Sequence, residues 1–176
     1  MWAKIGRSLL LILIVTVATL GGIDSAYAWK THHVLANAAH AAAKITISTP
    51  LNARNCRDTT PCSIESAAAA AKSYLLSAGL NQASCIDPKR PSFSGVLVWV
   101  FSCDGSSVCN TGDAEVCIKV DMTPVAMQRD GTFIPYTRAT VQCPHTWAIG
   151  FFLKLLPGRL TISLPKSVSA SALLQD

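Results

Sequence analysis

The stretch that decides the fold runs from Ser8 to Ser48. Residues 8–28 read SLLLILIVTVATLGGIDSAYA and residues 29–48 read WKTHHVLANAAHAAAKITIS. The first part carries no charge before Asp24, and no proline interrupts the chain before Pro50. In the second part, apolar residues recur at three- and four-residue steps on one side (Leu35, Ala38, Ala39, Ala42 and Ile45) and polar residues on the opposite side (Lys30, His33, Asn37, His40 and Lys44). The sequence therefore predicts one continuous helix.

The first half of this helix is apolar enough to lie in lipid. A helix over residues 8–28 would rise about 30 Å, the thickness of a bilayer's hydrocarbon core. Lys4 and Arg7 precede it, and positive charge on that flank predicts a cytoplasmic N-terminus. We therefore expect residues 1–7 to be cytoplasmic, 8–28 transmembrane and 29–49 a stem helix. Residues 50–176 would form an extracytoplasmic α+β domain with disulfides.

A second interpretation of the N-terminus remains open. Ala26-Tyr27-Ala28 is a small-x-small site behind a basic start and an apolar core, the pattern that signal peptidase cleaves. Cleavage after Ala28 would release a secreted, disulfide-stapled periplasmic binding protein.

All the cysteines lie beyond the hydrophobic segment. The chain has seven, and this density in a small domain is typical of an oxidising compartment. Cys56 with Cys62, and Cys103 with Cys109, would close short loops as local disulfides. A longer crosslink could use Cys85, Cys117 or Cys143. Because seven is odd, at least one thiol is free or pairs with another chain.

A second helix is expected after the turn-rich segment 52–62. Ser63 can cap it, Glu65 lies in its first turn, and Gly79 is a natural stop. The buried stripe of this helix would consist of Ile64, Ala68, Ala71, Leu75 and Ala78.

From Gly95 onward the apolar period changes to two, which is typical of strands. We expect strands at 96–102 and 115–122, with Val116, Ile118 and Val120 on one face. Weaker patterns predict strands at 133–143 and 160–164, separated by an apolar segment at 147–156. The fold class that follows is α+β: a long N-terminal transmembrane and stem helix packed on a small, mostly antiparallel sheet.

The composition argues against several classes of function. The net charge is +5, but the basic residues are scattered and Lys89-Arg90 is the only adjacent pair, so a nucleic-acid partner is not expected. No phosphate-binding loop, dinucleotide fingerprint or nucleophile elbow occurs.

The histidines and the Cys143-Pro144-His145 triplet suggest no catalysis either. His33 and His40 share a helix face with Lys30 and Lys44, and a cationic face disfavours a metal ion. We interpret Cys143 as one half of a disulfide. We therefore expect a protein that is not an enzyme, with no metal, no cofactor and no small-molecule substrate.

Two segments carry a resemblance to a known family. The segment Leu20-Gly21-Gly22-Ile23-Asp24-Ser25-Ala26-Tyr27 and the segment 33–43, HVLANAAHAAA, resemble the TadE-like family. These are minor pilins, or pseudopilins, of tight-adherence (Flp) pilus systems. The likeness lies in the hydrophobic helix, the acidic residue at its exit and the Leu-x-Asn-Ala-Ala stretch. The chain departs from a prepilin-type start, because no glutamate follows Gly6 at the usual distance.

The resemblance implies a pilin-like fold and a role in pilus assembly at the bacterial inner membrane. The partners would be other pilin-like subunits and the assembly machinery, contacted by helix packing. Small residues let helices approach closely in lipid. The positions expected to serve assembly are Gly21, Gly22, Asp24, Ala26, Leu35, Ala38 and Ala42.

Overall fold

The computed structural model describes the backbone of residues 2–48, 55–57, 60–95, 97–109, 115–123, 125–129, 132–134, 136–147 and 166–175. Side chains are described for residues 11–48, 61–95, 97–109, 115–123, 137–147 and 166–174. The expected strand at 160–164 lies outside the described residues, as does all but the first residue of the apolar segment 147–156.

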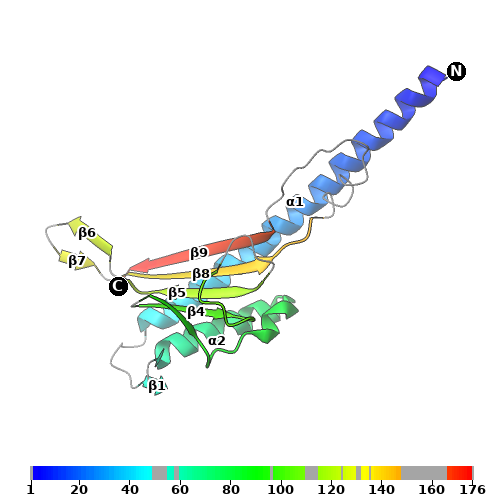
Figure 1. Cartoon of the computed structure of the whole chain (residues 1–176). Coiled ribbons are helices and arrows are strands. Elements are labelled where there is room, and N and C mark those ends of the chain that lie inside the picture. Colours follow the sequence, from blue (N-terminus) through cyan, green and yellow to red (C-terminus); the bar gives the residue numbers. More distant parts are fainter. Residues whose placement is uncertain are drawn as a thin grey trace.

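A single helix, α1 (Trp2–Ser48), confirms the continuous helix that the sequence predicts. At 1.5 Å per residue its 47 residues span about 70 Å, far more than the small domain needs. Its C-terminal half packs on the domain, whereas its N-terminal half projects away from it (Figure 1).

The second helix, α2 (Cys62–Ser77), lies against α1 on the same side of the sheet. Its N-cap is Pro61, so the prediction that Ser63 caps it is wrong. Ser63 is instead fully buried in the first turn. Gly79 ends the helix as predicted. With φ at +86° it allows Leu80 N–H to reach Leu75 O and its own N–H to reach Leu76 O, both at 3.0 Å.

The described strands are antiparallel wherever they pair. A five-stranded sheet has the order β3-β4-β5-β8-β9, from β3 (Ser92–Gly95), β4 (Val98–Ser102), β5 (Cys117–Asp121), β8 (Tyr136–Pro144) and β9 (Ser167–Gln175). Two small hairpins pair β1 (Asn55–Arg57) with β2 (Thr60–Pro61) and β6 (Val125–Arg129) with β7 (Thr132–Ile134). A short 3₁₀ helix, η1 (Asn81–Cys85), follows α2.

The core lies between the two helices and one face of the sheet. Val116, Ile118 and Val120 point into it as the alternation predicts, and β8 contributes Val141 and Ala139 opposite them. The α+β class and the antiparallel sheet are therefore confirmed.

The last strand, β9, is an element that the sequence did not predict. It pairs with β8 over nine residues, from Tyr136–Gln175 to Pro144–Ser167. Ala170 and Ala172 are buried, and β9 as a whole lies in contact with α1. The long helix is thus fixed to the edge strand of the sheet as well as to α2.

Candidate functional site

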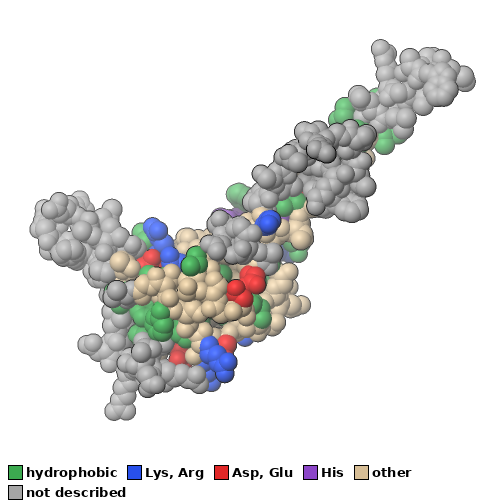
Figure 2. Space-filling model, viewed as in Figure 1, with side chains coloured by type: hydrophobic (Ala, Val, Ile, Leu, Met, Phe, Trp, Pro, Cys, Tyr) green, Lys and Arg blue, Asp and Glu red, His purple; other side chains and the backbone are tan. Residues whose placement is uncertain are grey.

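The most unusual surface of this protein is the projecting half of α1. Large apolar side chains there are solvent-facing, among them Leu11 at 61%, Ile23 at 65% and Trp29 at 68% exposure. Figure 2 shows patches of hydrophobic side chains where the described residues of this projecting part are in view. Among the described residues, α1 is the one helix long and apolar enough to cross a membrane, and the mean hydropathy of its 18-residue apolar window is 1.7.

The positions that the sequence marks for assembly fall into two groups. Gly22 and Ala26 are exposed, Gly21 is half-buried, and a Cβ added at Gly22 would meet nothing within 4 Å. Asp24 faces the other way and is 6% exposed. The small residues therefore present an open strip of backbone that another helix can approach.

Leu35, Ala38 and Ala42 belong to the second group. Each is 0% exposed within the chain's own core, where α1 meets α2 and the sheet. Their burial assigns them to holding the stem on its domain, so packing between subunits would use the exposed members of the set.

Asn37 joins the two helices by a polar contact. Its Nδ2 donates to the Tyr74 hydroxyl on α2 at 3.1 Å. Asn37 is part of the Leu-x-Asn-Ala-Ala stretch, and this bond gives the asparagine a structural role between helices.

A polar junction lies where the projecting half of α1 meets the domain, and the sequence did not predict it. His145, 8% exposed, follows β8 and stacks edge-on against Trp147 at 4.5 Å, with Tyr27 of α1 at 6.2 Å. A cavity of about 270 Å³ lies beside it, lined in part by Thr31 and Gln82. Within the described residues, His145 Nε2 has no hydrogen-bond partner. The Cys143-Pro144-His145 triplet was the available sequence signal, but only tertiary structure places it against α1.

The disulfides differ from the pairing that short loops suggest. Cys103 bonds Cys85, with Cα atoms 5.2 Å apart, and Cys109 bonds Cys117 at 5.7 Å, so the expected Cys103–Cys109 pair is wrong. Cys62 is also disulfide-bonded. The side chain of Cys56 lies outside the described residues.

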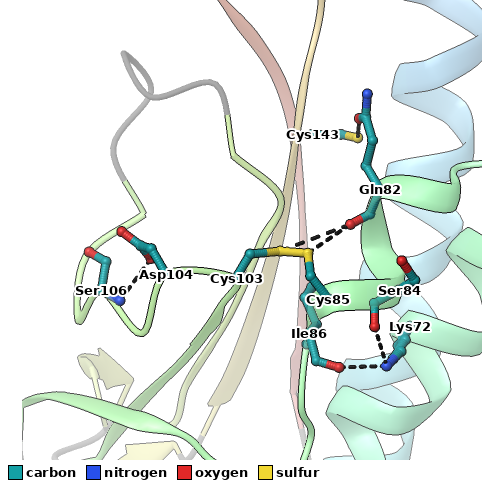
Figure 3. The surroundings of a disulfide bond; sticks show 9 residues. All are labelled: Lys72, Gln82, Ser84, Cys85, Ile86, Cys103, Asp104, Ser106 and Cys143. Carbon is teal, nitrogen blue, oxygen red and sulfur yellow. Dashed lines mark hydrogen bonds between the residues drawn. A yellow bond between two sulfur atoms is a disulfide. The ribbon is translucent and has the colours of Figure 1, made fainter.

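The Cys85–Cys103 bond connects the helix layer to the sheet. Cys85 ends η1 and Cys103 directly follows β4 (Figure 3). Lys72 of α2 fixes the same segment, since its Nζ donates to Ser84 O at 2.9 Å and to Ile86 O at 2.5 Å.

Cys143 is a buried free thiol, so its interpretation as half of a disulfide is wrong. Its Sγ lies 3.5 Å from Gln82 Oε1, and the backbone carbonyl oxygen of Gln82 lies 2.9 Å from Sγ of the disulfide-bonded Cys85 (Figure 3). Burial raises the pKa of Cys143 to about 11, because a thiolate would lose its hydration there. The thiol therefore stays protonated and unreactive near neutral pH.

Metal-ligating side chains do not gather in the described part of the chain. No group of three or more His, Cys, Asp or Glu could hold an ion there. His32 and His33, at 6.3 Å, stand edge-to-face, and His33 stacks on Trp29 at 4.7 Å.

Comparisons with protein-family models, with curated proteins and with solved structures find no match to this chain.

Proposed function

We propose that this protein is a membrane-anchored, pilin-like subunit that takes part in assembling a tight-adherence (Flp-type) pilus. The observation that carries the proposal is the continuity of α1. From Leu11 to Lys30 the helix is mostly exposed and largely apolar, and from Thr31 onward one side of it is buried in its own domain. Such a helix presents a domain outside the membrane while its free half packs with other subunits.

Assembly would proceed by close packing of helices in lipid. Ala18, Gly22 and Ala26 are exposed at four-residue spacing, which is the small-xxx-small pattern of tight helix contacts. Association in lipid depends on packing and hydrogen bonds between helices rather than on the hydrophobic effect. The resemblance of residues 20–27 and 33–43 to TadE-like pilins supports the assignment to this kind of machinery. The role requires no catalysis.

A second candidate is a secreted binding protein freed by cleavage after Ala28. One observation favours it: the regular stripe of core-facing residues begins at Thr31, so cleavage would retain the α1 side of the core. It would remove Tyr27 from the junction with His145.

The intact mass of the protein from isolated bacterial membranes, with alkaline carbonate extraction, tests the proposal. We expect a full-length species that resists extraction. A soluble species that begins at Trp29 would instead establish the secreted protein. If the assembly proposal is correct, deletion of the gene should also abolish or shorten the surface fibres. Unchanged fibres would exclude the assembly role.

A further inference from the structure

The part of α1 that follows Asp24 carries only basic charged side chains at its surface. Within the described residues of this helix, the exposed basic side chains beyond Asp24 are Lys30, Lys44 and three histidines, no acidic residue follows Asp24, and Asp24 itself is buried. No described carboxylate forms an ion pair with Lys44 or His40.

A groove lies between the end of α1 and the edge strand of the sheet. Its volume is about 490 Å³ and it is lined by His40, Ala41, Lys44, Ile47, Ser48 and Leu174. The floor is mainly aliphatic, Lys44 and His40 stand on α1, and none of the six is acidic. Figure 1 shows the C-terminal ends of α1 and β9 together at the end of the domain far from the projecting helix.

We propose that this groove binds an acidic segment of a different protein subunit, which places an apolar side chain on Ile47 and Leu174 and a carboxylate beside Lys44. The inference rests on the proposed function in one respect, namely that α1 is anchored in the membrane up to about Ala28. The aliphatic floor and the ammonium group of Lys44 together select a segment that carries both an apolar side chain and negative charge.

Anionic lipid does not fit this position. Lys44 stands 16 residues beyond Ala28, which is about 24 Å along the helix, and His40 stands about 18 Å beyond it. The headgroup layer extends only about 5–8 Å beyond the hydrocarbon core. The groove therefore lies outside the reach of lipid headgroups.

A second copy of this chain also fits poorly. Side-by-side parallel copies would place Lys44 near Lys44, and like charges repel. Three of the described acidic side chains on the domain surface already have partners: Asp87 pairs with Arg90 at 3.5 Å, Asp121 with Lys119 at 3.8 Å, and Asp104 accepts from Ser106 N–H at 2.8 Å.

Photo-crosslinking of the full-length protein in its native cells tests the inference. The photoreactive residue p-benzoylphenylalanine replaces Ser48, which is exposed at the groove, and in a second strain Ile47. Irradiation followed by mass spectrometry of the adducts should identify an acidic segment of another protein. A third strain, in which p-benzoylphenylalanine replaces Val15, is the control for membrane insertion and for irradiation.

Charge variants make the test specific. Lys44→Glu should lower the adduct yield by roughly tenfold, because reversal removes an attraction and adds a repulsion. Lys44→Arg should retain the yield, and Lys89→Glu, a charge reversal at an exposed position away from the groove, is the matched control. Adducts only with lipid or with a second copy would overturn the inference. So would the absence of adducts beside a working Val15 control, or a yield insensitive to Lys44→Glu.

The outcomes separate this inference from the assembly proposal. Suppose that adducts with an acidic segment form in cells whose fibres do not depend on this protein. That result would support the inference about the groove and would reject the role in pilus assembly. Fibres that depend on the protein, without such adducts, would reject the groove's partner alone.

Discussion

Gly22 and Asp24 stand two residues apart on α1 and face opposite environments. Gly22 opens onto space in which an added Cβ meets nothing within 4 Å, whereas Asp24 is 6% exposed. Two residues turn a helix by about 200°, so one side of α1 faces its own chain and the other is free for a neighbour.

The exposed side of α1 at Gly22 predicts what a larger side chain at this position would do. Gly22→Leu should reduce the number of surface fibres strongly, because a bulky side chain keeps neighbouring helices apart. Gly22→Ala should leave most fibres in place, since alanine is still small. Fibres are counted by electron microscopy in strains with equal amounts of protein in the membrane. Normal fibres in the Leu strain would argue against packing through this strip.

The buried side predicts loss of stability rather than loss of packing between subunits. Ala38 is 0% exposed between α1 and its domain. Ala38→Asp should lower the free energy of unfolding by at least about 3 kcal/mol, because it buries a charge in a tightly packed interface. Urea denaturation of the full chain in detergent measures this.

His32→Asp is the control for Ala38→Asp, because position 32 is exposed on the same helix. It should change stability by less than about 0.5 kcal/mol. Equal stability of the two variants would contradict the placement of Ala38 in the core.

The disulfide between helix layer and sheet predicts a second stability effect. Replacing Cys85 and Cys103 together by serine should cost about 3 kcal/mol, since the bond closes a chain segment with a sequence separation of 18. The Cys109–Cys117 bond closes a separation of only 8, so its double serine variant should cost less. Denaturation midpoints of the two variants decide the order, and the reverse order would show that loop entropy does not govern it.

Cys143 predicts a pH-dependent reactivity. Its pKa of about 11 in the folded protein exceeds the ordinary value of 9.0, so the thiolate is rarer in the fold than in the unfolded chain. At pH 8, alkylation by iodoacetamide should be about 100-fold slower in the native protein than in urea, and it should accelerate as the pH rises toward 11. Mass spectrometry of the alkylated peptide gives both rates.

The same pKa determines the direction in which the stability of the fold changes with pH. Above pH 9 the unfolded chain releases the Cys143 proton before the folded protein does, so this thiol's contribution is complete below pH 9 and is lost as the pH rises toward 11. Cys143→Ser removes that contribution. If the alkaline loss of stability is the same in the Ser variant, the thiol is not its source.

The sequence was sufficient for features that depend on local periodicity. The three- and four-residue steps of Leu35, Ala38 and Ala42 predicted the buried side of α1, and the alternation of Val116, Ile118 and Val120 predicted the inward face of β5. Gly79 predicted the end of α2 because its positive φ is one that side-chain-bearing residues rarely adopt.

Features that depend on partners far along the chain were not predictable from local pattern. The β9 sequence SVSASALLQ consists largely of small residues, which have a weak strand preference. Its pairing with β8 and its contact with α1 decide its conformation. Cys103 bonds Cys85 rather than Cys109, which is closer in sequence. The reason is its position directly after β4, where it meets the end of η1 in the helix layer. Likewise, His145 reaches α1 only once β8 has been placed in the sheet.

The unbroken course of α1 joins its projecting half to the domain through helix alone. Because the same helix carries the exposed apolar half and the fully buried Leu35, Ala38 and Ala42, the domain cannot swivel independently of the projecting half. A rotation of the projecting half about its axis would turn the domain with it, and a tilt would displace the groove beside Lys44 sideways. A force applied to the projecting half would therefore reach the domain through the backbone of α1, with no loop between them to absorb it.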